Sequence, residues 1–229
     1  PTGDAGLDGL LPDASRLRRL AADAPVEAEG LIARAAAEPA ALEEALRSEG
    51  YWAAIVAVRI AGEAPDAPGL ADRLRALPPG EVPVEVRVTP GQRYTLRRIA
   101  LRPSEPSEAV AVAALGEVPG LTPGDSARAA PVLDAEAALL TRLREGGHPL
   151  AAVVDREVVV DHEATAMDVT WTLSPGPRAA FAVPEIAGET RVNRALIARI
   201  TGRLAGEPYA PATLDRTRRE LQALGAFDS

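Results

Sequence analysis

Residues 84–94 read Val-Glu-Val-Arg-Val-Thr-Pro-Gly-Gln-Arg-Tyr, and this stretch decides the fold more than any other. Its first five positions alternate between apolar and charged residues, the pattern of a strand with one buried face. Proline and glycine then end the strand and begin a turn. The same arrangement returns at residues 169–176, and an arginine follows each Pro-Gly pair two residues later, at Arg93 and Arg178. The chain is therefore predicted to repeat one small module.

A second signal occurs three times, at the ends of predicted helices. Residues 46–50, 143–147 and 221–225 each begin with leucine and end with glycine. Glycine is favoured there because the residue after a helix commonly takes a left-handed conformation. Between each of the first two glycines and its Pro-Gly strand lies one further predicted strand, residues 54–60 and residues 153–160. The residues assigned to this structural motif are Gly50, Pro90, Gly91, Gly147, Pro175, Gly176 and Gly225.

Apolar segments and prolines place the other elements. Residues 94–101 and 181–186 are predicted to open the next two modules as strands, although Pro184 has no N–H group for a ladder. Pro39 is expected to separate an early helical stretch from the helix that ends at Gly50. The remaining predicted helices are a short one over residues 70–77, one through Val132, Leu139 and Leu143, one through Leu196, Ile200 and Leu204, and one that begins near Pro211.

A helix with one apolar stripe must cover another element, here one face of a three-stranded sheet. The predicted fold is therefore α+β, in tandem modules of the order strand, helix, helix, strand, strand. The modules are expected to span residues 1–92, 93–177 and 178–229. The first is expected to lack its opening strand and the third to stop before its last two strands, as in a piece of a longer chain.

Composition excludes several classes of function. Apolar residues make up 47% of the chain, enough for a core, but aromatic residues only 3%. There is no cysteine, so disulfides, a thiol nucleophile and thiolate metal sites are excluded. The net charge is −8, so no nucleic-acid partner is expected.

Individual side chains give little sign of catalysis. The sequence has two histidines, His148 and His162, without a spaced second ligand, and they are interpreted as surface residues. The acidic runs at residues 155–157 and 161–163 are interpreted as a solvated hairpin rather than a cation site. Trp171 is in phase with its apolar strand neighbours, so core packing is favoured over a ligand platform with Trp52. Nucleophile elbows and phosphate loops are absent, so no enzyme activity, metal or cofactor is expected.

Three motifs in register resemble the POTRA module (polypeptide-transport-associated). They are the helix end and aromatic pair of residues 46–52, the Pro-Gly-Gln-Arg-Tyr junction of residues 90–94, and residues 206–209, Gly-Glu-Pro-Tyr, followed by Leu214-Asp215 and residues 221–227. The sequence departs from the family at His148-Pro149, where an aromatic residue is usual, and at Pro184. The resemblance implies that each three-stranded sheet is mixed and covered on one face by two helices.

With three predicted modules, the sequence resembles the TamA-like group of the BamA/TamA superfamily. BamA-like proteins carry more modules and two-partner-secretion transporters fewer, and both stay open as alternatives. The resemblance implies the periplasmic part of an outer-membrane protein of a Gram-negative bacterium, with a membrane barrel later in the same chain. Implied partners are unfolded outer-membrane or autotransporter client proteins and a TamB-like inner-membrane protein. A passive spacer or docking scaffold is the alternative function.

The expected binding mechanism is strand addition. The edge of a sheet has free backbone N–H and C=O groups, to which an extended segment can bind with little demand on sequence. The resemblance implies that the edge used is the strand that comes second of the three in sequence order in each module. The residues carried over are Val56, Val58 and Ile60 in the first module and Val158 and Val160 in the second. The alternative is that neighbours or solvent cover these edges.

Overall fold

The structure is a computed structural model that describes residues 4–21, 27–78, 80–187 and 193–224. It divides into two compact units, of which the first comprises residues up to 97 with residues 123–130 and 159–168. The second comprises residues 98–122, 131–158 and those from 169 onward. This division cuts through the middle sheet, so the predicted module boundaries after residues 92 and 177 stay predictions.

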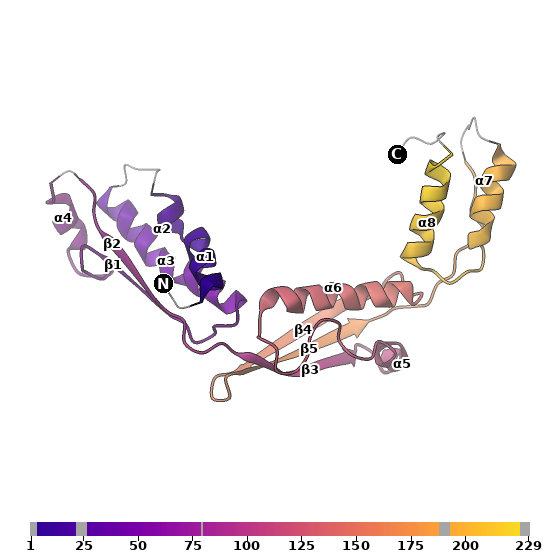
Figure 1. Cartoon of the computed structure of the whole chain (residues 1–229), viewed down its shortest axis with the longest axis horizontal. Helices are drawn as coiled ribbons and strands as arrows, with labels where there is room; N and C mark the ends of the chain where they lie inside the picture. The colour runs from indigo at the N-terminus through magenta and orange to yellow at the C-terminus, as the bar shows by residue number, and fades with distance from the viewer. Residues whose placement is uncertain (1–3, 22–26, 79, 188–192, 225–229) are drawn as a thin grey trace. The chain divides into compact units, whose positions relative to one another are not determined.

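The first part of the chain is three helices, a strand, a short helix and a strand (Figure 1). They are α1 (Ala5–Ala14), α2 (Arg16–Arg19), α3 (Ala28–Ser48), β1 (Ile55–Ile60), α4 (Leu70–Arg75) and β2 (Val84–Thr89). β1 and β2 pair antiparallel, with Ile55 opposite Thr89 and Ile60 opposite Val84. Among the described residues, those before β1 are helical or irregular, and this sheet has two strands.

Alternation in β1 produces the core of this part of the chain. Val56, Val58 and Ile60 are buried, while the residues between them face solvent. Leu42 and Leu46 of α3 share a buried cluster with Val56, and Leu70 and Leu74 of α4 share one with Val58 and Ile60. The predicted strand over residues 54–60 and the predicted short helix over residues 70–77 are both formed.

The predicted helix break at Pro39 is wrong, because α3 continues through it. Proline removes one backbone hydrogen bond and crowds the carbonyl four residues earlier, which destabilises an isolated helix. Here the helix is held on both sides of the proline. Ala35 and Leu42 are both buried, so tertiary packing overrides the local preference.

The middle part has the predicted order of strand, helix, helix, strand, strand. Its elements are β3 (Thr95–Pro103), η1 (Pro106–Glu108), α5 (Ala109–Ala113), α6 (Ala129–Glu145), β4 (Ala152–Asp161) and β5 (Ala166–Ser174). The sheet order is β3-β5-β4. The N–H of Thr95 donates to the carbonyl of Thr165 (3.3 Å) and that of Ser104 to Leu173 (2.8 Å), so β3 runs parallel to β5. β4 and β5 form a hairpin through residues 162–165.

Helix α6 covers one face of this mixed sheet, as Figure 1 shows. Leu139 of α6 and Val169, Trp171 and Leu173 of β5 are fully buried. The indole N–H of Trp171 donates to Glu136 of α6 at 2.9 Å, which satisfies the buried donor. The predicted α+β fold, with a three-stranded mixed sheet, is confirmed here, as is the core position of Trp171.

The last described residues form α7 (Arg194–Thr201), η2 (Gly202–Leu204) and α8 (Pro211–Gln222). The predicted helix start at Pro211 is confirmed. The predicted strand over residues 181–186 is wrong, because the described part of this region makes one isolated bridge, between Ala180 and Pro208. Pro184 cannot donate to a ladder, and neighbouring backbone groups bond to a loop instead. Gly225 lies outside the described residues.

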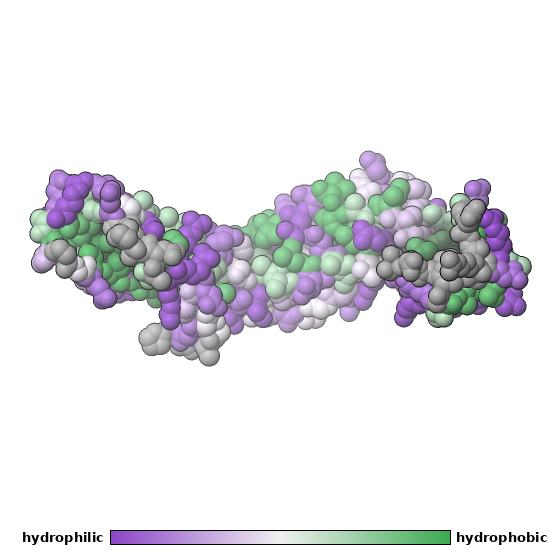
Figure 2. Space-filling model, turned by 90° about the horizontal axis from the view of Figure 1, so that it is seen from above, coloured by the Kyte–Doolittle hydropathy of each residue, from purple (hydrophilic) through white to green (hydrophobic). Residues whose placement is uncertain are grey.

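Hydrophobic residues are scattered over the face drawn in Figure 2, in several separate patches among hydrophilic ones. Large exposed side chains in the middle part include Val110, Leu133 and Val159. Among the described residues, every helix is too short or too polar to cross a bilayer.

Candidate functional site

Two junctions built on the motif glycines are the most distinctive feature of the structure. In the first, the N–H of Tyr51 donates to the carbonyl of Leu46 (2.9 Å), which ends α3 in a Schellman motif. Gly50 has φ +90°. Its carbonyl accepts from the N–H of Tyr94 at 2.8 Å, and a Cβ at this position would lie 3.2 Å from the Ala127 carbonyl oxygen. Glycine is therefore required for both conformation and space.

The second junction repeats this geometry. The N–H of His148 donates to the carbonyl of Leu143 (3.1 Å), and Gly147 has φ +97°. The carbonyl of Gly147 accepts from the N–H of Ala179 at 2.9 Å. The residues that correspond to Gly50 and Tyr94 thus make the same backbone contact.

The Pro-Gly turns correspond as well. Gly91 and Gly176 have φ values of +73° and +68°. A Cβ on Gly91 would lie 3.5 Å from the carbonyl oxygen of Ala53, and one on Gly176 would lie 3.5 Å from Cβ of Leu150. Each turn therefore closes on the residue three positions after its helix-capping glycine.

The segment after each junction makes a matching set of three backbone hydrogen bonds. In the first set Ala127 donates to Tyr94 (2.9 Å), Leu96 to Asp125 (2.8 Å) and Gly124 to Leu96 (2.7 Å). In the second set Tyr209 donates to Ala179, Phe181 to Glu207 and Gly206 to Phe181, all at 2.9 Å. The repeat seen in the sequence is thus a repeat of hydrogen bonds. The region after residue 178 begins as the middle part does.

Side chains fix the first junction through Asp4, which also caps α1. The hydroxyl of Tyr51 donates to Asp4 Oδ2 at 2.8 Å, and Arg93 Nη2 donates to the same oxygen at 2.9 Å. The bond from Tyr51 lowers the pKa of Asp4, while burial and this same bond raise the pKa of Tyr51. The Arg93 guanidinium lies 4.8 Å from the centre of the Tyr51 ring, a cation–π contact. Arg128 adds an ion pair to Glu49 (2.9 Å).

Different side chains fix the second junction. His148 replaces the tyrosine, and its Nδ1 donates to the carbonyl of Gly176 at 2.9 Å. Arg178 donates to the carbonyl of Gly146 (3.2 Å). Glu145 accepts from the N–H of Ala212 (3.0 Å), so the end of α6 caps the start of α8.

Glu108 ties η1 to the second Pro-Gly turn. Its carboxylate accepts from the hydroxyls of Ser104 (2.6 Å) and Ser174 (2.8 Å) and from the N–H of Gly176 (3.3 Å). The bond from Ser104 is the largest of several that lower the pKa of Glu108.

The first predicted binding edge is partly covered. The N–H of Ala61 donates to the carbonyl of Pro83 (2.8 Å), so alternate residues from Ala61 back along β1 bond to β2. Val56, Val58 and Ile60 therefore point their backbone groups away from β2. Ile60, however, exchanges hydrogen bonds with Glu63 (2.8 and 3.0 Å). Val56 and Val58 are left as the residues of β1 whose backbone can meet another strand.

The second predicted edge is longer. β4 lies at one side of the β3-β5-β4 sheet and bonds to β5 alone within the sheet. Val158 is 39% exposed, Val160 is half-buried, and Val159 faces solvent. The structure thus places both predicted residues on a ten-residue edge strand.

The face of this sheet opposite α6 carries a cross-strand charge cluster. Arg97 of β3 donates from Nε and Nη2 to Asp168 of β5 (3.0 and 2.8 Å) and from Nη1 to Asp161 of β4 (2.8 Å). Asp168 and Asp161 raise the pKa of Arg97. The N–H of Ala164 and then Arg97 lower the pKa of Asp161.

The remaining candidate residues have structural contacts. His162 Nδ1 lies 2.8 Å from the Tyr94 hydroxyl, and the two rings meet edge to face. Asp161, in the acidic run considered as a cation site, accepts from Arg97 and from the N–H of Ala164 (2.9 Å). Within the described ranges, no three acidic or histidine side chains are grouped as metal ligands.

Sequence reasoning missed two carboxylates, Glu38 and Glu108, each of which accepts several hydrogen bonds within its own part of the chain. Glu38 is fully buried and accepts from the Ser15 hydroxyl and from the N–H groups of Arg16 and Leu17 (both 3.0 Å). Its partners lie more than 20 positions earlier, at the start of α2, and no periodic pattern in the sequence predicts that contact. Glu108 had a local signal, because Glu105 and Glu108 form a capping box around η1.

No protein-family model matches this sequence, and no curated protein matches it. Solved structures of POTRA modules are similar to it. The crystal structure of POTRA modules 3–5 of Haemophilus influenzae BamA is 17% identical with a TM-score of 0.49, and covers 84% of this chain and 70% of its own.

Two shorter structures are also similar. POTRA module 4 of the same BamA is 22% identical over 38% of this chain and 95% of its own, with a TM-score of 0.31. POTRA modules 1–2 of Omp85 from Anabaena are 13% identical over 58% of this chain and 78% of their own, with a TM-score of 0.36. The element order and the hydrogen bonds given above, rather than these similarities, establish the fold.

Proposed function

We propose that the chain is a run of POTRA modules in the periplasmic part of a TamA-like outer-membrane protein, where it binds unfolded client chains by strand addition. The observation that carries this proposal is the junction made twice, at Gly50 and at Gly147. A spacing of glycine, Pro-Gly and arginine that reproduces the same hydrogen bonds is a property of a tandem module. Outer-membrane and autotransporter proteins are the proposed clients.

The edge of β4 is the proposed binding site. A ten-residue strand with one neighbour leaves half of its backbone groups for another strand. Binding through backbone groups demands little of the client sequence, which suits a protein that handles many unfolded chains. The exposed valines Val154 and Val159 add apolar contact on the two faces of the strand. We infer binding rather than catalysis as the activity.

Photo-crosslinking in the full-length protein tests this site. A photoreactive residue at Val159, 47% exposed in β4, is expected to form an adduct with an unfolded autotransporter client. The matched control is Leu133, 50% exposed on α6, the helix that covers the same sheet. Equal adducts at both positions would contradict binding at the edge, as would normal client assembly after deletion of residues 1–229.

A passive spacer or docking scaffold toward a TamB-like inner-membrane partner is the second candidate. It is favoured by the bond from Ala212 to Glu145, which joins α8 to the end of α6. Proline at Val158 or at Val56 separates the two candidates, because it impairs strand addition but leaves the length of the chain unchanged. Loss of client assembly in a variant that remains folded by circular dichroism supports binding, and retained assembly supports the spacer.

A further inference from the structure

A groove of about 800 Å³ lies between α5 and the end of α6, within the second compact unit. Its apolar lining is Val110, Ala111, Ala114, Leu115 and Leu143. Leu143 is buried, whereas the side chain of Val110 is 82% exposed. An apolar hollow bordered by such an exposed side chain is typical of a binding surface. It is called the α5–α6 groove below.

The charged residues among the described lining of the α5–α6 groove are basic. Arg142 and Arg178 are exposed, and each donates to backbone carbonyls, Arg142 to Leu115 (3.3 Å) and Arg178 to Gly146 (3.2 Å). Glu117 also meets Arg142 through its carbonyl, at 3.1 Å, and not through its carboxylate. Neither arginine forms an ion pair within the described residues. On a chain of net charge −8, this groove therefore favours an acidic partner.

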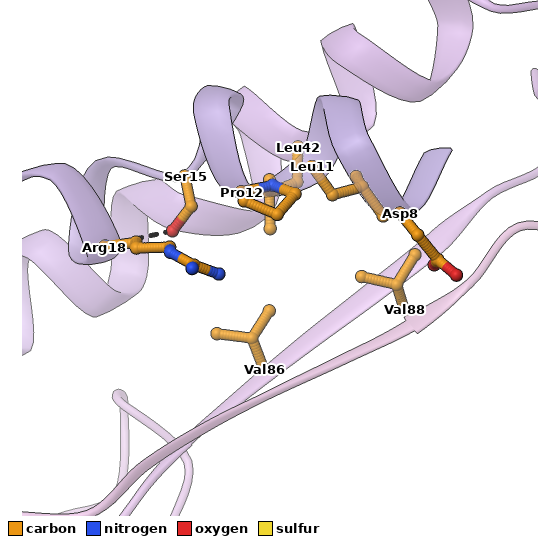
Figure 3. A pocket seen from close by; sticks show the side chains of 8 residues that line it. All are labelled: Asp8, Leu11, Pro12, Ser15, Arg18, Leu42, Val86 and Val88. Atoms are coloured by element: carbon orange, nitrogen blue, oxygen red, sulfur yellow. Dashed lines mark hydrogen bonds between the residues drawn. The ribbon is translucent and has the colours of Figure 1, made fainter. Parts of the chain in front are cut away.

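The groove beside α1, in the first part of the chain, has a different balance of charge. It has a volume of about 560 Å³ and is also largely apolar. Asp8 and Arg18, however, lie at opposite ends of its lining, as Figure 3 shows. Its lining carries one charge of each sign, so a preference for acidic partners is a property of the α5–α6 groove and not of apolar grooves in this chain generally.

The first junction shows which chemical group side chains at the junction hold. Tyr51 and Arg93 there both donate to the carboxylate of Asp4. Arg178 corresponds to Arg93, but its partner is a backbone carbonyl. The nearby carboxylate of Glu108 is bonded to two serine hydroxyls and a backbone N–H, so it does not take the place of Asp4. The second junction can therefore accept a carboxylate that comes from elsewhere.

The walls of the α5–α6 groove determine the form of the partner. Backbone N–H and C=O groups in a helix bond along its axis, so these walls offer an extended chain no ladder. A polypeptide in this groove must pair its own backbone groups, as a helix does. The small side chains of Ala111 and Ala114 leave room for its apolar ridge. The stretches outside the described ranges are at most five residues long, less than two helical turns, so none of them supplies this helix.

We propose that the α5–α6 groove binds an amphipathic helix of another protein. Apolar residues of that helix pack on Val110, Ala111 and Ala114, and its carboxylates pair with Arg142 and Arg178. Arg142 lies one turn of α6 before Gly146, the partner of Arg178, so the two acidic residues are expected about four to seven positions apart, or about 6–10 Å along a helix. The inference goes beyond the proposed function, because it uses side chains between helices rather than the backbone of β4.

Two peptides of equal composition test the proposal on the 229-residue protein. The first is acetyl-Ala-Glu-Gln-Ala-Leu-Leu-Gln-Ala-Glu-Gln-Ala-Ala-amide, whose acidic residues share a helix face with its leucines. The second is acetyl-Ala-Gln-Glu-Ala-Leu-Leu-Glu-Ala-Gln-Gln-Ala-Ala-amide, whose acidic residues lie away from that face. Amide NMR shifts of Val110, Ala111 and Ala114 report binding.

The first peptide is expected to shift these amides and to bind about fivefold more tightly than the second, since it alone can pair with both arginines. Arg142→Gln is expected to reduce this preference. Val110→Asn is expected to weaken both peptides about fivefold, because apolar contact is lost. The matched control, Leu133→Asn, changes an exposed position of α6 outside the groove lining and should leave both affinities unchanged. Circular dichroism checks that the three variants remain folded.

Equal binding of the two peptides, no shifts at millimolar peptide, or equal effects of the two asparagine variants would overturn the proposal. Shifts of the same amides on concentrating the free protein would assign the groove to a second copy of the chain and would also overturn it. So would undiminished binding of the first peptide with proline at its eighth position, because that peptide cannot remain helical. Client crosslinks at Val159 are a separate measurement, so the two proposals fail separately.

Discussion

Replacing Gly50 by alanine tests whether the first junction holds the structure together. At φ +90° an L-residue is strained, which costs about 1–2 kcal/mol. The added Cβ would lie 3.2 Å from the oxygen and 3.4 Å from the carbon of the Ala127 carbonyl, tighter than an ordinary contact. Relief of that contact displaces Gly50 from Tyr94 and weakens their hydrogen bond, which contributes about 1 kcal/mol. The expected loss in unfolding free energy is therefore about 2–3 kcal/mol.

Gly116→Ala is the matched control. Gly116 also has a positive φ, +67°, but a Cβ there would meet nothing within 4 Å. It should lose only the conformational part, about 1–2 kcal/mol. Urea unfolding followed by circular dichroism measures both variants, and hydrogen exchange of the Tyr94 amide shows whether the junction opens locally. Equal losses in the two variants, with unchanged Tyr94 exchange in Gly50→Ala, would refute the role assigned to the close approach to Ala127.

Three further predictions concern buried or tightly bonded side chains. Glu38→Gln should lose about 2 kcal/mol of unfolding free energy in urea, because the NH2 group of the glutamine would face the hydrogen-bond donors that Glu38 now accepts from. Glu44→Gln, on the exposed face of the same helix, should lose less than about 0.5 kcal/mol in the same assay. Trp171→Phe should lose about 2–4 kcal/mol in the same assay through the lost bond to Glu136 and the space left by the indole; a smaller loss than Glu44→Gln would contradict this. The lowered pKa of Glu108 means that its stabilisation is complete above the ordinary value of about 4.5 and disappears as pH falls through the folded-state pKa. Glu108→Gln should therefore flatten the fall of urea midpoints below about pH 4.5, and an unchanged slope would count against the Ser104 and Ser174 bonds.

Local sequence signals correctly predicted the turns at Gly50 and Gly147 and the strands around them in the first two repeats. The capping glycines, the Pro-Gly turns and the alternation in residues 84–88 each act on a few neighbouring residues, so their pattern is visible in the chain. The middle module followed from them in full order. These are also the residues whose backbone contacts occur twice.

The features that were missed depend on partners far along the chain. Pro39 predicted a break in the helix, but the burial of Ala35 and Leu42 on either side of it outweighs the local preference of proline for a helix end. The turn at Ser15 is stabilised by Glu38, which no local pattern connects to it. The strand predicted over residues 181–186 failed for a related reason, since a strand needs a ladder partner as well as apolar residues.

Among the sheet edges, only a strand order could show which ones are open. The sequence located the strand over residues 153–160, but its place beside β5 alone is a property of the β3-β5-β4 order. The covering of Ile60 by Glu63 likewise came from a tight turn after β1. The sequence can therefore predict that these segments are strands, but only the strand order shows that they lie at the edge of a sheet.

Hydrogen exchange across β4 in the presence of a urea-unfolded autotransporter barrel domain tests the central claim most directly. A client strand added to the edge protects the amides that point away from β5 and leaves the other amides of Ala152–Asp161 as they were. The account predicts this alternating protection, at client concentrations that give the Val159 crosslink. Client binding with unchanged exchange throughout β4 would contradict it.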